Sequence, residues 1–345
     1  SPARRLPGFF SEKIGVPVYP FESPNFLPSA KNKQVNLVRS VAYNLFRLHK
    51  YLSSIRYINR MIKETGADVV VNFYELLTGL TYLFCHPKAL MVCIAHQYLF
   101  LHPDFVFPGQ NRLSLVSLKF FTRMTAIGAT KKLALSFRKM REVPSERIVV
   151  VPPLLRKEVL ETTPVNGDYL HGYLLNSGFS EEIRSWHKVH PNVALHIFWD
   201  KKEVRPEVKV DSFLSFHQLN DTLFIRYMAG AKAYATTAGF ESVCEAMYLG
   251  KPVLMVPTHI EQSCNAFDAV QAGAGVVADR FDLDALLELS RTHRPNPAFS
   301  HWVKQADWLI LREFRPDLLM EETPASLWRR LSTRWIYRLG KTLSI

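Results

Sequence analysis

The sequence is poor in cysteine. Its four cysteines stand far apart among 345 residues, have apolar neighbours and form no Cys-x-x-Cys pair. This spacing argues against a zinc site and against a disulfide framework. We therefore expect reduced thiols in a cytoplasmic protein, at Cys85, Cys93, Cys244 and Cys264.

Long apolar runs are also missing. The stretch from Ala89 to Ala95 is followed at once by His96 and Gln97, and it is far shorter than the ~20 residues that cross a bilayer. A membrane-spanning segment is therefore not predicted. The chain starts with Ser1 instead of Met and shows no signal-peptide pattern, which favours a missing N-terminal piece.

What is present suits a folded protein with two cores. Hydrophobic residues make up 48% of the chain and charged residues 21%, and the length exceeds what one core usually supports. The net charge of +12 would attract nucleic acid, an anionic membrane or a phosphorylated substrate. No nucleic-acid-binding module accompanies the charge, so nucleic acid is not an expected partner.

Strands alternate with helices along both halves of the chain. Apolar spacing predicts strands at 68–73, 90–95, 132–137, 147–151, 169–175, 193–199, 213–216, 231–236 and 252–256. The predicted helices cover 33–64, 112–126, 181–190, 221–229 and 240–249. This order predicts two open, mostly parallel sheets with helices on both faces. We expect domains at 1–153 and 168–322, a linker at 154–167 and a C-terminal helix at 323–345.

The most informative stretch runs from Thr236 to Asn265. A buried strand ends at Thr236, and a glycine at 239 lets a ligand approach the start of a helix, whose free N–H groups suit a diphosphate. Glu245 follows on this helix, where a carboxylate can bind two ribose hydroxyls. After the next strand, Glu261 and Gln262 offer acceptors and donors for sugar hydroxyls. A plain turn with a capping residue would explain neither Glu245 nor this pair.

These residues resemble the signature of GT-B glycosyltransferases, especially the UDP-glycosyltransferases and the MurG-like N-acetylglucosaminyltransferases. The spacing matches at Gly239, Ser242, Glu245, Gly250, Pro252, Pro257, Glu261, Gln262 and Asn265. The resemblance implies a GT-B fold of two Rossmann-like domains with a cleft between them. It also implies a UDP-sugar donor, an acceptor hydroxyl, an inverting reaction and no metal or other cofactor.

By the same resemblance, Gly239 and Ser242 contact the diphosphate, Glu245 the ribose, and Glu261 with Gln262 the donor sugar. Thr237 stands where many of these enzymes carry a phosphate-binding His, and Glu241 stands where several carry Asn. The nucleobase would lie at a loop around residues 216 and 217. The full predicted donor set is Phe216, His217, Thr237, Gly239, Phe240, Glu241, Ser242, Glu245, Glu261, Gln262 and Asn265.

The catalytic base is expected in the first domain, on loops that follow strands. His96 has an ordinary pKa suited to accepting a proton from the attacking hydroxyl, or it only bonds within its loop. Glu75 is the second candidate, or it caps a helix. The family's N-terminal glycine-rich loop has no match in residues 1–32, so the loop is either missing from the chain or lost.

Two basic amphipathic segments bear on the acceptor. The helix at 33–64 and the tail at 326–343, with Trp335 and Arg338, either pack on the first domain or lie on the inner face of the cytoplasmic membrane, which would suit a lipid-linked or cell-envelope acceptor. Two other functions stay open. One is a UDP-N-acetylglucosamine 2-epimerase, which shares part of the pattern, and the other is a non-catalytic nucleotide-sugar-binding protein.

Overall fold

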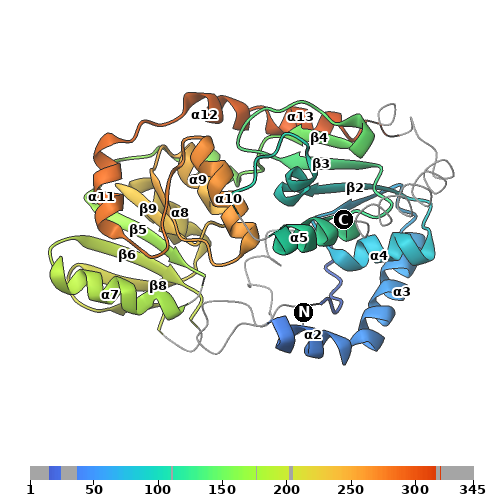
Figure 1. Cartoon of the computed structure of the whole chain (residues 1–345), viewed down its shortest axis with the longest axis horizontal. Helices are drawn as coiled ribbons and strands as arrows, with labels where there is room; N and C mark the ends of the chain where they lie inside the picture. The colour runs from blue at the N-terminus through green and yellow to red at the C-terminus, as the bar shows by residue number, and fades with distance from the viewer. Residues whose placement is uncertain are drawn as a thin grey trace.

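The computed structural model describes residues 15–24, 37–109, 112–175, 177–201, 205–315 and 319. These residues form two α/β units that lie side by side, each built on a largely parallel sheet (Figure 1). Every helix within these ranges is too short or too polar to cross a bilayer. The expected class of two Rossmann-like units is confirmed.

The N-terminal sheet has four parallel strands in sequence order. They are β1 (Val69–Asn72), β2 (Leu90–Ala95), β3 (Lys131–Leu135) and β4 (Ile148–Val151). Helices α4 (Leu76–Cys85) and α5 (Arg112–Thr125) and the short turns η1 (His96–Leu101) and η2 (Pro144–Glu146) complete the unit. A run such as β2 is apolar throughout because parallel strands are covered on both faces.

The single helix expected at 33–64 is in fact two. Helix α2 covers Leu37–Leu45 and α3 covers Leu48–Glu64, and the chain turns between them. The hydroxyl of Tyr51 donates to Asn44 Oδ1 at 2.7 Å, which fixes the bend. An apolar stripe alone does not reveal such a break, because both helices keep the same helical spacing.

The C-terminal sheet has seven strands. Their order is β11 (Gly275–Val277), β10 (Val253–Met255), β9 (Ala233–Thr236), β5 (Tyr169–Leu174), β6 (Ala194–Trp199), β8 (Leu214–Gln218) and β7 (Glu207–Lys209). All pairs are parallel except β7 with β8. After β5 the chain adds β6 and β8 on one side of it, and then returns to add β9, β10 and β11 on the other side. A ligand crevice is expected where the carboxyl ends of these two strands meet.

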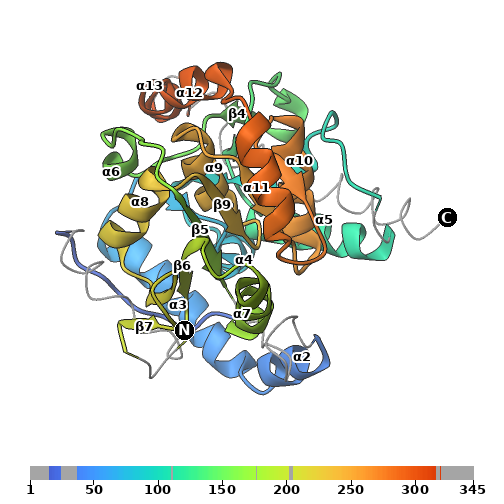
Figure 2. The same cartoon turned by 90° about the vertical axis from the view of Figure 1, so that its left-hand side faces the viewer.

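Helices cover both faces of this sheet (Figure 2). Helices α8 (Asp221–Gly230) and α9 (Phe240–Tyr248) pack on one face, whereas α7 (Ser180–Val189) and α11 (Leu283–Thr292) pack on the other. The remaining elements of this unit are α6 (Lys157–Leu160), η3 (Ser177–Phe179) and α10 (Ile260–Gln271).

The end of the described chain returns to the N-terminal unit. After α11 it runs back through α12 (Pro297–Val303) and α13 (Ala306–Arg312), which lies along β4 (Figure 1). Trp302 donates its indole N–H to the Ser136 carbonyl at 2.9 Å, and Lys131 binds Glu313 at 2.9 Å. The helix predicted at 323–345, including Trp335 and Arg338, lies outside the described residues.

Candidate functional site

The site begins where β9 meets α9. The strand ends at Thr236, and Ala238 takes a left-handed backbone with φ of 64°, which is uncommon for any residue other than glycine. This sharp turn places the first N–H groups of α9, which have no partner within the helix, at the crevice beside β5. Strained backbone of this kind clusters at ligand sites.

Gly239 is the N-cap of α9, yet the chain itself does not demand a glycine there. Its φ is −66°, and an added Cβ would meet only the Ser242 hydroxyl oxygen, at 3.6 Å. Gly250 differs, because its φ of 71° ends α9 in a conformation that side chains disfavour. The two glycines of the signature therefore differ in role. Gly250 is needed for the backbone conformation, whereas Gly239 leaves open space that a ligand could fill.

Glu245 is buried and already has a strong partner. Arg156 donates to both of its carboxylate oxygens, from Nε at 2.6 Å and from Nη2 at 2.8 Å, and also binds Asp221. A bidentate pair uses one edge of the carboxylate and leaves further lone pairs for hydroxyl donors. Sequence reasoning missed Arg156 and Asp221, although Arg156 follows a predicted strand at the edge where ligands bind.

The second predicted carboxylate, Glu261, is linked to the other unit. The side-chain amide of Gln97 donates to Glu261 Oε1 at 2.7 Å across the seam between the units. Glu241 projects from the first turn of α9 and is exposed. Crowding by protein atoms raises the pKa of Glu241, and the carboxylates of Glu261 and Glu245 add to that rise. Three carboxylates thus gather around this crevice.

Gln262 and Asn265 are buried and hold the backbone around the site. Gln262 Oε1 accepts from the backbone N–H of Thr258 at 2.9 Å and from its hydroxyl at 2.8 Å. Asn265 donates to the Ala238 carbonyl at 3.5 Å. Thr237 is buried as well. In this structure these side chains shape the loops that carry the site.

Phe216 and His217 do not lie in a loop, as was expected, but inside strand β8. Phe216 is fully buried and stacks on Trp199 at 4.4 Å. His217 faces the opposite side, stacks on Phe198 at 5.0 Å and shares a hydrogen bond with Ser215. The strand runs longer than predicted because residues 214–218 are almost continuously buried, so the loop before α8 is only residues 219 and 220.

His96 lies on the seam between the units, directly after β2. Its Nδ1 is 2.7 Å from the Leu135 carbonyl oxygen, which can only accept, so Nδ1 carries the proton and Nε2 keeps a lone pair. Nε2 is buried without a partner, and the ring stacks on Phe240 at 4.0 Å. Burial lowers the pKa of His96 and keeps the ring neutral.

Glu75 has a clear local contact. It is the N-cap of α4, and its Oε1 accepts from the Leu77 N–H at 3.0 Å and from the Ser23 hydroxyl at 2.7 Å. This is the capping arrangement that was weighed against a catalytic role. The side chain is half-buried.

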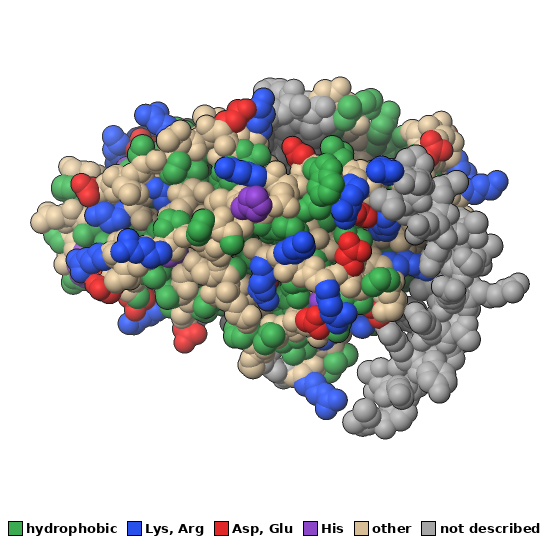
Figure 3. Space-filling view, turned by 90° about the horizontal axis from the view of Figure 1, so that it is seen from above, with side chains coloured by type: hydrophobic (Ala, Val, Ile, Leu, Met, Phe, Trp, Pro, Cys, Tyr) green, Lys and Arg blue, Asp and Glu red, His purple; other side chains and the backbone are tan. Residues whose placement is uncertain are grey.

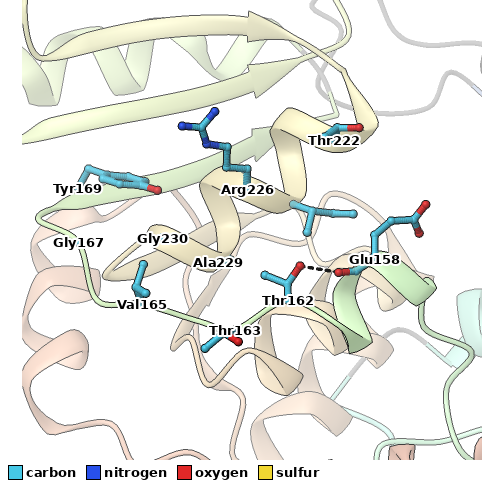
Figure 4. A pocket seen from close by; sticks show the side chains of 11 residues that line it. Glu158, Thr162, Thr163, Val165, Gly167, Tyr169, Thr222, Arg226, Ala229 and Gly230 are labelled. Atoms are coloured by element: carbon cyan, nitrogen blue, oxygen red, sulfur yellow. Dashed lines mark hydrogen bonds between the residues drawn. The ribbon is translucent and has the colours of Figure 1, made fainter.

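A separate pocket of about 500 Å³ lies between the linker and α8 (Figure 4). Glu158, Tyr169 and Arg226 are among the residues that line it, and none of the predicted donor residues does. Among the described residues, no group of three His, Cys, Asp or Glu side chains could hold a metal ion.

A comparison with protein families gives a match over most of the chain. The family described as Glycosyl transferase family 1 matches residues 25–289. The Caenorhabditis elegans protein "Putative UDP-glucuronosyltransferase ugt-48" is 30% identical over 111 residues. That match covers 30% of this chain and 19% of the worm protein, so the chain spans about a fifth of that relative.

Solved structures share the architecture at low sequence identity. The glycotransferase of kitacinnamycin has a TM-score of 0.52 at 14% identity, with 91% of this chain and 85% of that chain covered. LpCGTa, solved in complex with UDP, has a TM-score of 0.49 at 13% identity, with 85% and 82% covered. The first of these likenesses establishes the fold alone.

Proposed function

Because the chain belongs to glycosyl transferase family 1 and has the GT-B fold, we propose that it transfers a sugar from a UDP-sugar to an acceptor hydroxyl. The observation that carries the proposal is the start of α9, where N–H groups without a partner inside the helix and the open side of Gly239 face the crevice, although the Glu241 carboxylate bonds to its own backbone N–H. Such a helix end binds phosphate oxygens without a metal. The name of the worm relative also favours a UDP-linked donor.

The donor would lie along the crevice in three parts. The diphosphate would bind at Gly239 and Ser242, with Glu241 beside it. The ribose hydroxyls would bind the free edge of Glu245, which Arg156 holds in place. The donor sugar, a hexose or an N-acetylhexosamine, would bind Glu261, together with the amide of Gln262.

The proposed reaction inverts the anomeric carbon. The acceptor oxygen forms a bond to that carbon while the bond to the diphosphate oxygen breaks, and the helix N–H groups stabilise the departing charge. His96 takes the acceptor proton at Nε2, since that nitrogen holds a lone pair and the ring is neutral. His96 is buried against Phe240, so the loop must move for an acceptor to reach it. Glu75 is the other candidate base.

The acceptor is proposed to be lipid-linked and to be met at a membrane surface. The bend between α2 and α3 exposes apolar side chains, with Phe46 84% exposed beside Leu45, Leu48 and Leu52. Such a projecting apolar corner suits shallow contact with a bilayer. Basic side chains are not gathered on the face seen in Figure 3, where Lys and Arg are mixed with acidic and apolar residues.

A Gly239→Ala variant tests the donor site. We expect its thermal stability to match wild type, because the added methyl group meets only Ser242, whereas UDP should bind about tenfold more weakly, because the methyl group blocks phosphate contacts. Calorimetric titration with UDP gives both affinities. Gly109→Ala is the matched control, since a Cβ there meets nothing within 4 Å. Wild-type protein that binds no UDP would overturn the proposal.

A further inference from the structure

The seam between the two units brings an acceptor-side loop onto the donor site. Gln97 projects from η1, which directly follows β2 of the N-terminal unit, and Glu261 from the first turn of α10. Their 2.7 Å hydrogen bond joins residues 164 positions apart in the chain. The amide N–H therefore occupies the carboxylate oxygen to which a donor-sugar hydroxyl would be expected to donate.

Neighbouring contacts also join the two units along this seam. His96 stacks on Phe240 at the start of α9, and Arg138 forms an ion pair with Asp268 of α10. Cys264 of α10 packs within the N-terminal core and is fully buried. These contacts close the seam over the proposed donor site.

This closed seam is imperfectly satisfied. Two buried polar atoms on it lack a hydrogen-bond partner, namely His96 Nε2 and Asp268 Oδ2. Burying a polar atom unpaired is unfavourable, whereas water would satisfy each of them after opening. The Gln97 hydrogen bond therefore stabilises the closed seam, whereas these unpaired atoms favour separation of the loop from α10.

We infer that Gln97 is a self-inhibitory latch, which mimics a sugar hydroxyl on Glu261 and must be displaced before a nucleotide-sugar binds. The inference rests on the proposed donor site. The latch should affect UDP and UDP-sugars differently. UDP alone has no group that binds Glu261, whereas the sugar of a UDP-sugar competes with Gln97 for that carboxylate. Removing the latch should therefore favour UDP-sugars over UDP.

The test compares wild type with Gln97→Ala and Gln97→Glu. UDP, UDP-glucose, UDP-galactose and UDP-N-acetylglucosamine serve as probes in calorimetric titrations. For at least one UDP-sugar we expect both variants to bind roughly fivefold more tightly than wild type, because one charge-assisted hydrogen bond no longer competes, while UDP affinity stays within about twofold. Lys232→Ala is the matched control, since it breaks an exposed contact with Asp168 within the C-terminal unit, and it should change neither the UDP affinity nor the UDP-sugar affinity.

Thiol labelling gives a second measurement. Cys264 is buried on the seam, and burial raises its pKa to about 12, so it should react slowly with a maleimide in wild type and faster in Gln97→Glu, where two carboxylates repel each other. Half-buried Cys85 should react at one rate in all variants. Unchanged Cys264 labelling with unchanged UDP-sugar affinity would overturn the latch and leave the donor site standing. No UDP binding by any variant would overturn both.

Discussion

At the residue scale, the position of Arg156 decides how Glu245 can act. The guanidinium binds both oxygens of a buried carboxylate and reaches Asp221 at the start of α8. A lysine keeps the charge but cannot make the paired contacts. We expect Arg156→Lys to lower the free energy of unfolding in urea by about 1–2 kcal/mol and to weaken UDP binding, because Glu245 is no longer fixed.

Arg226→Lys controls for the substitution itself. Arg226 is exposed on α8, and the exchange there should change stability by less than about 0.5 kcal/mol. If Arg156→Lys unfolds at the same urea concentration as wild type, the paired contact contributes nothing to the fold.

Single residues also show what the sequence could and could not reveal. Gly239 and Glu245 were predicted at the site because a glycine before a helix and a carboxylate within it are local features. The partner of Glu245 was not predictable, since Arg156 lies 89 positions away in the chain. The left-handed backbone of Ala238 was not predictable either, since nothing in the sequence marks an alanine for this conformation.

At the element scale, the stability of helix α4 distinguishes a capping role of Glu75 from a catalytic role. Removing an N-cap costs about 1 kcal/mol, so Glu75→Ala should lower the free energy of unfolding by about that amount. Its sugar-transfer rate should stay within about threefold of wild type, because loss of a general base would cost at least about a hundredfold. Urea unfolding and a transfer assay measure the two effects.

Glu75→Gln completes this comparison, since the amide oxygen can still accept from the Leu77 N–H. A hundredfold slower transfer in a Glu75→Gln protein of unchanged stability would instead make Glu75 the base. The capping contact itself is short-range, with the acceptor and the donor two residues apart, and so it could be weighed from the sequence.

Long buried strands were predictable, whereas short edge strands and the helices α10 and α11 were not. Strands β2, β5 and β6 match their predicted ranges within about one residue, because long buried apolar runs leave few alternatives. Strands β7 and β11 were missed, since each has three residues and lies at a sheet edge. The turn between α2 and α3 was missed for the reason that it interrupts no apolar pattern.

At the scale of the whole molecule, sequence gives the two units but not how they meet. The alternation of strands and helices predicts each sheet separately. Contacts such as Gln97 with Glu261 depend on the orientation of one unit on the other, which no local pattern encodes. The return of α12 and α13 onto β4 joins the units a second time.

Acid stability is a property of the C-terminal sheet as a whole. Three histidines from neighbouring strands lie beneath α8, and Ser215 Oγ is 2.8 Å from both His196 Nδ1 and His217 Nε2. His171 Nδ1 is 3.2 Å from the His196 carbonyl, and its Nε2 is buried without a partner. Within the part of the chain that the structure describes, no carboxylate is hydrogen-bonded to His171, so the His196 carbonyl alone favours its charged form and burial outweighs that contact.

Burial lowers the pKa of His171 to about 3 and that of His196 to about 4, against about 6.5 in the unfolded chain. Below about pH 6.5 the unfolded chain binds more protons than the folded chain. The contribution of these histidines to the free energy of unfolding is therefore fully present above about pH 6.5 and is lost as the pH falls towards 3. His171 alone gives a slope of up to about 1.4 kcal/mol per pH unit. Urea unfolding at pH 7.5, 6.0 and 5.0 should show a shallower decline for His171→Gln than for wild type. Parallel declines would mean that His171 is protonated equally in the folded and the unfolded chain.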